Sequence, residues 1–338
     1  MTSVVPAAVT RSKTLVGPAL EAALDQLHPT LRQVARYHRG WVDEDGRPVA
    51  GGGGKALRPA LAVLGAQAAW APGEVALPGA VATELVHDFS LLHDDLMDGD
   101  RERRHRPTAW TVYGPGPAIL AGDALLSLAT DLLLEVKGPA GTAAQQLLAT
   151  AVRRLVHGQA DDLDLEARPD VSVGDYVAMA AGKTGALLSC ACAIGAALAG
   201  AEPKLVGALG AFGEHLGLAF QLVDDLLGMW GAPATTGKPV LSDLRSRKNS
   251  APIVFALTVP GAVSAPLRDY LARAEAADED ELAELARLVE RLGGRDRTTA
   301  EVQRQLQLAE GSLAGLDLPT DVASELLATA RYVTARDR

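Results

Sequence analysis

Hydrophobic residues recur every three or four positions along most of the chain, and no segment shows the strict alternation of a half-buried strand. This spacing predicts a helix over residues 20–40, interrupted before Pro29, and successive helices from Lys55 onward. Charged, amphipathic stretches at 278–292 and 298–313 are typical of outer helices. Glycine and proline predict breaks near residues 72–73, 114–117, 138–141, 168–170, 202–203, 232–237 and 260. The pattern therefore predicts an all-α fold.

These helical segments follow one another with short connections and without a repeat of fixed period. We therefore expect one all-α domain over residues 16–338, preceded by a flexible arm over residues 1–15. The segment VDEDGRPVAGGGG, residues 42–54, predicts a loop, and its four glycines allow a close backbone approach to another group.

The longest uncharged run, residues 184–201, raises the question of a membrane span. It has 18 residues rich in alanine, glycine, serine and cysteine, which is marginal in length and weak in hydrophobicity for a span. A buried core helix is therefore the interpretation we prefer. Cys190 and Cys192 cannot form a disulfide framework, and the first 20 residues lack the pattern of a signal peptide. We expect a cytoplasmic protein without stable membrane insertion.

Composition narrows the classes of partner. Hydrophobic residues make up 48% of the chain, enough for a sizeable core, whereas aromatic residues make up only 4%, which favours helices rich in alanine and leucine. The formal net charge of −10 argues against a nucleic-acid binder, which usually presents a basic face. Anionic ligands remain compatible with this charge where cations are concentrated locally.

The segment LLHDDLMDGDRERRHRPT, residues 91–108, places five acidic residues around and before four arginines. Asp94 and Asp98 are four residues apart, so on a helix they project from the same face. Carboxylate ligands with room for water and substrate phosphates suit Mg²⁺. The alternative is a solvated acidic helix end without a ligand.

A second short acidic motif, Asp224–Asp225 in FQLVDDLLGMWG, changes this balance. No other charged residue occurs from Leu216 to Leu227, so the motif follows an apolar helix, and Gln221 lies one turn before Asp225. Two such helices facing each other would line a cavity with carboxylates on both walls. Mg²⁺ ions could then bridge the carboxylates to a diphosphate.

Basic residues occur next to glycines and close to the acidic motifs. Arginine suits phosphate because its planar guanidinium donates paired hydrogen bonds. Each basic residue taken alone is as expected of a solvated surface, but together they predict a substrate with a diphosphate head and a hydrocarbon tail. The candidates are Lys55, Arg58, His87, Arg103, Arg104, Lys183 with Thr184, Lys238 and Lys248.

The motifs GGKALRP, ELVHDFSLLHDDLMD, RRHRPT, GKTG, FQLVDDLLG and GKPVLSDLRSRKNSAPIVFAL occur in this order from about residue 50 to the C-terminus. Together they resemble the trans-isoprenyl diphosphate synthases of the polyprenyl synthetase family, and geranylgeranyl diphosphate synthases of bacteria in particular. The resemblance implies an isoprenoid synthase-type bundle of helices around a deep central cavity. It also implies a homodimer.

The resemblance further implies roles for individual residues. Asp94, Asp98 and Asp224 match metal ligands for three Mg²⁺ ions. Lys55, Arg58, His87 and Arg104 match the site for the diphosphate of isopentenyl diphosphate, and Arg103, Lys183, Thr184, Gln221, Lys238 and Lys248 match the site for an allylic diphosphate. The implied reaction begins with ionisation of the allylic substrate, helped by Asp94, Asp98, Arg103, Lys183, Asp224 and Lys238. Isopentenyl diphosphate then attacks the cation, and the family pattern calls for no side-chain general base.

Two positions depart from the family pattern. The second acidic motif ends in Gly228 where the family has aspartate, which implies altered metal affinity. His105 stands where the family has glycine after the arginine pair, so it reshapes the loop or adds a phosphate contact.

Product length is predicted from two residues before Asp94. Phe89 resembles the bulky residue that would end chain growth near C20, and Ser90, one turn before Asp94, is small. The alternative is an ordinary core phenylalanine, because on an ideal helix Phe89 points away from the face that carries Asp94.

Two other functions compete with chain elongation. A class I terpene cyclase shares the fold but needs no site for isopentenyl diphosphate, which the set containing Arg58 and His87 provides. A non-catalytic family member, acting as partner subunit or cargo, is favoured only by Gly228.

Overall fold

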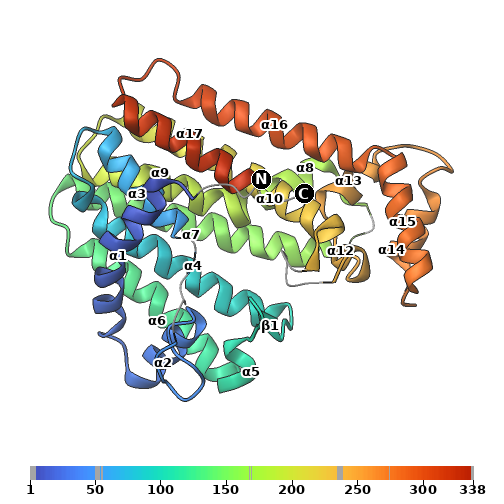
Figure 1. The fold of residues 1–338 in the computed structure, drawn as a ribbon, viewed down its shortest axis with the longest axis horizontal. Helices are drawn as coiled ribbons and strands as arrows, with labels where there is room; N and C mark the ends of the chain where they lie inside the picture. The colour runs from blue at the N-terminus through green and yellow to red at the C-terminus, as the bar shows by residue number, and fades with distance from the viewer. Residues whose placement is uncertain are drawn as a thin grey trace.

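The computed structural model describes residues 5–49, 54, 56–166, 168, 170–233, 239–273 and 275–335. Within these residues the protein is built from α-helices, with a single short 3₁₀ segment, one π-helical turn and one two-stranded hairpin (Figure 1). The predicted all-α fold is confirmed. The helices are α1 (Ala7–Leu24), α2 (Pro29–His38), α3 (Leu57–Ala68), α4 (Leu77–Met97), α5 (Ala109–Tyr113), α6 (Pro115–Leu134), α7 (Pro139–Glu166), α8 (Val173–Ala180), α9 (Ala186–Leu198), α10 (Pro203–Trp230), α12 (Ser242–Arg245), α13 (Ala251–Leu257), α14 (Ala265–Ala272), α15 (Glu279–Arg291), α16 (Gly294–Ser312) and α17 (Thr320–Thr334).

The shorter elements lie between these helices. The 3₁₀ segment η1 (Gly73–Ala76) precedes α4, and the π-helical turn η2 (Ala181–Gly185) joins α8 to α9. Strands β1 (Glu102–Arg103) and β2 (Arg106–Pro107) form an antiparallel hairpin directly after α4. Proline begins or nearly begins α2, α6, α7 and α10, where its fixed φ suits the first turn and its missing N–H costs nothing.

The flexible arm predicted over residues 1–15 is wrong for most of its length, because α1 begins at Ala7. Ala8, Val9 and Ser12 are buried, and Ala8 packs in the same apolar cluster as residues of α3, α10 and α17. Arg11 forms an ion pair with Glu325 of α17. The long-range contacts with α17 explain why the sequence of this segment alone did not reveal an ordered helix.

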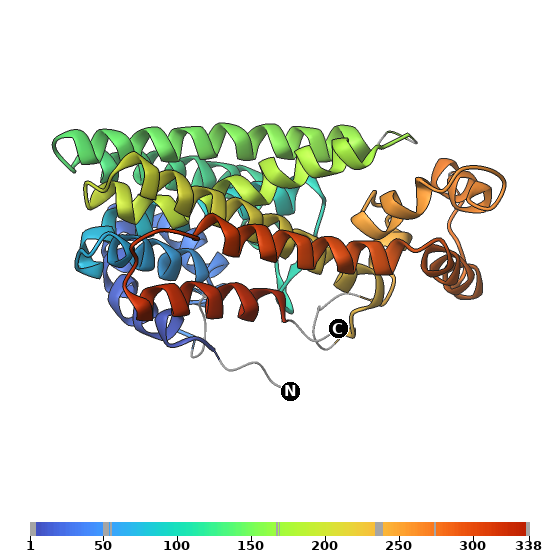
Figure 2. The same ribbon diagram turned by 90° about the horizontal axis from the view of Figure 1, so that it is seen from above.

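Helix α9 lies at the centre of the fold. Twelve of its thirteen residues are buried, so the predicted core helix within 184–201 is confirmed. It packs against α3, α4, α7 and α10, and α16 and α17 run along one long edge of the molecule (Figures 1 and 2). Small residues permit this packing: a Cβ at Gly195 would lie 1.9 Å from the carbonyl oxygen of Ala62. The backbones of α3 and α9 are therefore in contact.

Four helical stretches in the described part of the chain have the length and apolar composition of a membrane span. In their most apolar windows, 67% of residues are buried in the stretch 73–97 and 61% in 173–198, but only 39% in α6. Most of the window therefore serves the core in these two stretches, whereas in α10 half of it is buried and in α6 less than half.

Candidate active site

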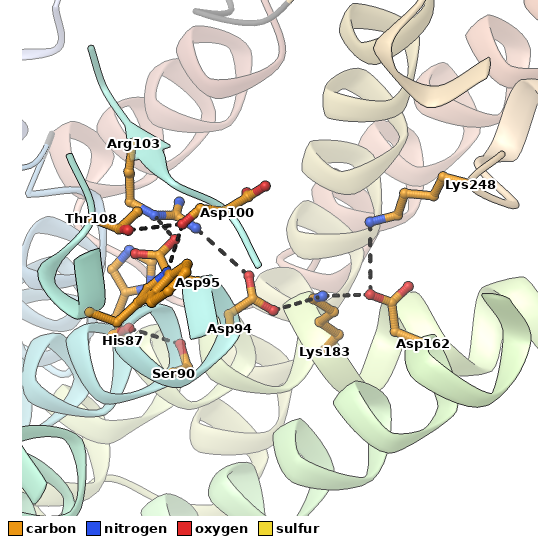
Figure 3. Close-up of polar contacts among 11 residues, drawn as sticks. His87, Ser90, Asp94, Asp95, Asp100, Arg103, Thr108, Asp162, Lys183 and Lys248 are labelled. Carbon is orange, nitrogen blue, oxygen red and sulfur yellow. Dashed lines mark hydrogen bonds and ion pairs between the residues drawn. The ribbon is translucent and has the colours of Figure 1, made fainter. Parts of the chain in front are cut away.

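The first aspartate cluster consists of Asp94, Asp95 and Asp98, at the C-terminal end of α4. Figure 3 shows Asp94 and Asp95. The side chain of Asp94 is 18% exposed and accepts a hydrogen bond of 3.1 Å from the Nζ of Lys183. Asp98 is more exposed, yet reduced hydration of its carboxylate and the neighbouring charge of Asp94 raise its pKa to about 6. Asp94 and Asp98 thus face the same space, as their spacing predicted.

Asp95 plays a different part from its two neighbours. It is almost fully buried, and its Oδ1 accepts a 2.7 Å hydrogen bond from the Nε of Arg103. Burial raises the pKa of Asp95 to about 6, although the Arg103 guanidinium opposes this shift. The same arginine lies 3.8 Å from Asp94. Asp95 is therefore a positioning residue, which holds Arg103 close to Asp94.

The hairpin β1–β2 carries the arginine pair. Its two turn residues, Arg104 and His105, both have positive φ, 53° and 60°, as a tight hairpin turn requires. The hydroxyl of Tyr37 donates to the carbonyl of Pro107 at 2.8 Å, and Arg106 donates to the carbonyl of Val42, also at 2.8 Å. His105 thus adopts a conformation that glycine adopts without strain, and its role toward phosphate stays a prediction.

Lys183 lies on the π-helical turn η2 and joins two walls of the site. Its Nζ donates to Asp94 of α4 and, at 2.6 Å, to Asp162 of α7 (Figure 3). Lys248 approaches the same Asp162 oxygen at 3.8 Å. These carboxylates raise the pKa of both lysines although burial opposes the shift, so both ammonium groups stay charged. Such π-helical turns often occur at functional sites.

Asp162 was missed by the sequence interpretation, although it holds the two lysines. It lies among four acidic residues of DDLDLE, which looks like a solvated helix end. The burial pattern of α7 shows the missed signal, because Leu155, Gly158, Asp162 and Leu165 form one buried stripe. Gly158 lets η2 approach, since a Cβ there would lie 2.1 Å from the backbone nitrogen of Lys183.

The second aspartate cluster, Asp224 and Asp225, lies near the C-terminal end of α10. Asp225 is buried and accepts three hydrogen bonds, from the hydroxyl of Tyr176 (2.7 Å), the amide of Ala251 (2.7 Å) and the side chain of Gln221 (2.9 Å). Burial raises its pKa. Asp225 therefore connects α8, α10 and α13, whereas half-buried Asp224 is the ligand candidate.

Thr184 and Gln221 form a contact across the same region. The hydroxyl of Thr184 donates to Oε1 of Gln221 at 2.7 Å, and the amide nitrogen of Gln221 donates to Asp225. The structure thus joins the GKTG motif to the second aspartate cluster, 37 residues away in sequence. Lys55 and Lys238 lie outside the described residues, so their predicted roles stay predictions.

Arg58, His87 and Arg104 form a basic group beside the first aspartate cluster. The Nε of Arg58 is buried and has no hydrogen-bond partner among the described residues. Burial, followed by the charges of Arg58 and Arg104, lowers the pKa of His87 well below its usual range. A Cβ added at Gly54 would lie 4.0 Å from the guanidinium nitrogens of Arg104. Three members of the predicted set, Arg58, His87 and Arg104, therefore lie together, whereas the place of Lys55 stays a prediction.

His38, at the end of α2, belongs to this basic group and was not predicted. Reduced hydration, followed by the charges of Arg103, Arg104 and Arg39, lowers its pKa to about 3. Arg39 itself forms buried ion pairs with Glu84, at 3.1 Å, and with Asp88. No motif marks His38, which reaches the site through the packing of α2 against α4, α5 and α6.

The half-buried His38 predicts an acid sensitivity of the fold, because its pKa is lowered. Its folded pKa lies below the unfolded value, so the unfolded chain binds more protons between pH 6.5 and about 3. The free energy of unfolding should therefore fall with decreasing pH in this window, by up to ~1.4 kcal/mol per pH unit for this group. We expect His38→Gln to flatten the slope in urea titrations at pH 4–7. A variant with the unchanged wild-type slope would contradict this prediction.

The donor set fits Mg²⁺ held jointly with a substrate. No three His, Cys, Asp or Glu side chains among the described residues gather closely enough to hold a metal alone. Asp94 and Asp98 on α4 and Asp224 on α10 are oxygen ligands on separate helices. Mg²⁺ typically takes one or two carboxylates and completes its shell with water and substrate phosphates.

The residues predicted to set product length, Phe89 and Ser90, precede Asp94 on α4. Phe89 is 7% exposed, and its ring packs edge-on against His93 with the ring centres 4.9 Å apart. The His93 ring in turn lies against Gly122 of α6. Ser90 is half-buried and donates to the carbonyl of His87 at 2.8 Å. Phe89 thus packs toward α6.

A cavity of about 600 Å³ lies at some distance from these carboxylates. It is bounded by the first half of α7, one face of α9 and the start of α10, and the Arg154–Glu214 ion pair, at 3.0 Å, lies at its edge. Its lining does not include Asp94, Asp98 or Asp224. The deep central cavity implied by the resemblance stays a prediction.

Comparisons with known proteins agree with this geometry. A sequence profile of the family described as Polyprenyl synthetase matches residues 40–289. A (2E,6E)-farnesyl diphosphate synthase of Mycobacterium tuberculosis is 47% identical over 325 residues, covering 95% of this chain and 90% of the relative. A geranylgeranyl diphosphate synthase of the same organism is 39% identical, covering 97% and 93%.

Solved structures are also similar to this fold over nearly the whole chain. A polyprenyl synthetase from Streptomyces coelicolor superposes with a TM-score of 0.93 and 50% identity, covering 98% of this chain and 99% of that one. A geranylgeranyl pyrophosphate synthase from Corynebacterium glutamicum, complexed with isoprenyl diphosphate and magnesium, gives 0.80 and 25% identity, covering 98% and 99%. The similarity therefore extends over the whole chain.

Proposed function

Because this chain belongs to the polyprenyl synthetase family, we propose that it condenses isopentenyl diphosphate with an allylic diphosphate and forms mainly geranylgeranyl diphosphate, C20. The single observation that carries the chemistry is the lysine bridge between α4 and α7. Lys183 contacts Asp94 and Asp162, with Lys248 beside them and Arg103 aimed at the same aspartate. This arrangement surrounds one space with ligands for metal and for phosphate.

When bound, Mg²⁺ would supply positive charge for the departing diphosphate of the allylic substrate. Asp94, Asp98 and Asp224 would hold the metal, and by resemblance to the family we expect three Mg²⁺ ions. Lys183 and Arg103 are fixed by Asp162 and Asp95, so their charges are already oriented toward the leaving diphosphate and little reorganisation is needed.

The basic group would hold the second substrate. Arg58 and Arg104 supply charge for the diphosphate of isopentenyl diphosphate, and the neutral imidazole of His87 supplies a hydrogen bond. Once the allylic cation forms, the double bond of isopentenyl diphosphate attacks it. We assign no side chain as the base that removes the final proton, since the released diphosphate is the expected acceptor.

The proposed C20 product rests on Phe89. It lies five residues before Asp94, about 7.5 Å along the helix axis, and its ring is buried where α4 meets α6. The relatives do not agree on product length: the relative at 47% identity is named a farnesyl diphosphate synthase, and the one at 39% a geranylgeranyl diphosphate synthase. A C15 product is the second candidate.

Sizing the products tests the proposal. The purified protein receives Mg²⁺, isopentenyl diphosphate and, separately, dimethylallyl, geranyl or farnesyl diphosphate, and the dephosphorylated alcohols are measured by mass spectrometry. We expect C20, and we expect Phe89→Ala to extend the product by at least one C5 unit. Leu92→Ala, which removes a similarly buried side chain of α4, is the control. A wild-type C15 product, or an unchanged length in Phe89→Ala, would contradict the role of Phe89.

We also propose that the protein is a cytoplasmic homodimer. On α6, Leu120 and Leu134 are two heptads apart and 57% and 51% exposed. On the adjacent α7, Val156 and Leu163 are 47% and 39% exposed. If these side chains form one patch, that patch would be the interface, because a large exposed apolar patch usually marks a protein interface. Light scattering should give twice the mass of the chain, and a monomer mass would contradict the dimer.

A further inference from the structure

The side chain of His93 contacts both Phe89, the residue proposed to limit chain length, and helix α6. Phe89 and His93 are four residues apart on α4, so they project toward the same side of the helix. Their rings meet edge to face, with the ring centres 4.9 Å apart and the ring planes at 70°. Helix α6 packs against α4 (Figure 1). The imidazole therefore supports one side of the Phe89 ring.

The imidazole of His93 is held by the backbone of α6. Its Nε2 lies 3.1 Å from the carbonyl oxygen of Ile119, and because a carbonyl oxygen only accepts, Nε2 is the donor. The carboxylate of Asp123 lies 3.8 Å from the same nitrogen, but this side chain is 60% exposed, so its contribution is small. The hydrogen bond to Ile119 therefore orients the ring.

Gly122 of α6 provides the space in which the imidazole lies. A Cβ at this position would lie 2.4 Å from Nε2 and 2.6 Å from Cδ2 of His93. Both distances are far below van der Waals contact, so a side chain at position 122 would displace the ring. Gly122 is not among the glycines with positive φ, so its role here is steric and not conformational.

The place of His93 around the helix axis also explains how Phe89 can act on a chain that begins near Asp94. At 3.6 residues per turn, Phe89 points about 140° away from Asp94, whereas His93 lies about 100° from Asp94 and about 40° from Phe89. The imidazole therefore occupies the sector between the Phe89 ring and the helix face that carries Asp94. The two rings together extend the wall on the α6 side toward that face.

We propose that His93 is a positioning residue for product length, which holds the Phe89 ring in place from the side of α6, and that Gly122 makes room for it. The inference rests on the proposed function, in which Phe89 limits the growth of the chain. Product length then depends on a contact between two helices and not on one side chain. Phe89 limits the chain only while the imidazole keeps its ring from turning aside.

The ratio of product lengths tests this, because it does not depend on how much of a variant is folded. The wild type and His93→Ala receive Mg²⁺, geranyl diphosphate and excess isopentenyl diphosphate, and the dephosphorylated alcohols are sized by mass spectrometry. We expect the ratio of products one C5 unit longer to the main wild-type product to rise about tenfold in His93→Ala.

His215→Ala is the matched control. His215 is also a half-buried histidine that joins two helices, since its Nδ1 lies 2.7 Å from Oε1 of Gln305 and so connects α10 to α16. It has no contact with Phe89. We expect its product lengths to match those of the wild type, even if its melting temperature falls as much as that of His93→Ala.

Variants of Gly122 test the steric part of the inference. Gly122→Ala should shift the products toward shorter chains, because the new methyl group displaces the imidazole from α6 toward α4. Gly122→Leu combined with His93→Ala returns most of the removed volume from the opposite helix. We expect this double variant to bring the product ratio back to within about threefold of the wild type.

A second double variant shows whether His93 acts through Phe89. Once Phe89→Ala has removed the ring, the imidazole has nothing left to hold, so adding His93→Ala should change the product lengths no further. A further extension in this background would mean that His93 lines the chain pocket itself, and it would overturn the positioning role.

The other outcomes separate this inference from the proposed function. Wild-type product lengths in His93→Ala, with longer products in Phe89→Ala, would overturn the inference and leave the proposed function intact. Unchanged lengths in Phe89→Ala would overturn the role of Phe89 and this inference together, while chain elongation stands. If the wild type consumed no isopentenyl diphosphate, the proposed function itself would be wrong.

Discussion

Replacing Asp94 by asparagine is expected to lower kcat/KM about 10³-fold, the loss typical of removing a preorganised charge that stabilises the transition state. Asp94 is the point where three parts of the site meet. It is a ligand candidate on α4, it accepts a hydrogen bond from Lys183, and it lies 3.8 Å from Arg103. Asparagine keeps the shape but provides neither the negative charge for Mg²⁺ nor a second anionic oxygen for the cations.

Steady-state condensation assays at saturating Mg²⁺ measure this effect. Asp269→Asn, an exposed substitution on α14 at the far end of the molecule, is the matched control and should retain wild-type kcat/KM. The melting temperature of Asp94→Asn should stay close to that of the wild type, because the side chain is only partly buried. Activity within tenfold of the wild type would show that Asp94 does not hold the metal.

Replacing Lys183 by methionine is expected to lower kcat/KM by about 10²–10³-fold and to destabilise the fold. The loss of activity follows from removal of a cation that the leaving diphosphate requires. The loss of stability follows because Asp162, whose side chain is 6% exposed, would keep, among the described residues, only the ion pair with Lys248 at 3.8 Å. Leaving a buried charge without its main partner typically costs about 3–5 kcal/mol.

Two measurements separate these effects. Thermal melting gives the stability loss, and assays well below the melting temperature give the catalytic loss. Lys204→Met removes the same charge from an exposed position at the start of α10, so both values should match those of the wild type. If Lys183→Met lost stability while keeping its kcat, Lys183 would be structural and the phosphate role would be wrong.

The sequence revealed most of the architecture because its signals are local. The all-α fold and the positions of the breaks follow from helical spacing and from glycine and proline, and the structure confirms both. The first ligand pair follows from the spacing of Asp94 and Asp98 on one helix. The contact between Lys183 and Asp94 was not local, since 89 residues separate them, yet the motifs placed both in one site.

The residues that sequence reasoning missed depend on tertiary contacts. Asp162 lies on the buried stripe of α7, and Asp88, Asp95 and Asp225 are likewise buried on the apolar faces of α4 and α10. An acidic residue at a core position of a helix therefore indicates a site residue more strongly than a cluster of acidic residues in the sequence does. His38 carries no such pattern, and only the packing of α2 brings it to the site.

The stoichiometry of the reaction tests the central claim most directly. Labelled isopentenyl diphosphate is supplied with geranyl diphosphate, and both hydrocarbon product and released pyrophosphate are measured with Mg²⁺ and with EDTA. We predict the release of one pyrophosphate for each isopentenyl unit incorporated, and only when Mg²⁺ and the allylic substrate are both present. Pyrophosphate released from geranyl diphosphate without incorporation of label would identify a cyclase, and no release under any condition would contradict catalysis by this site.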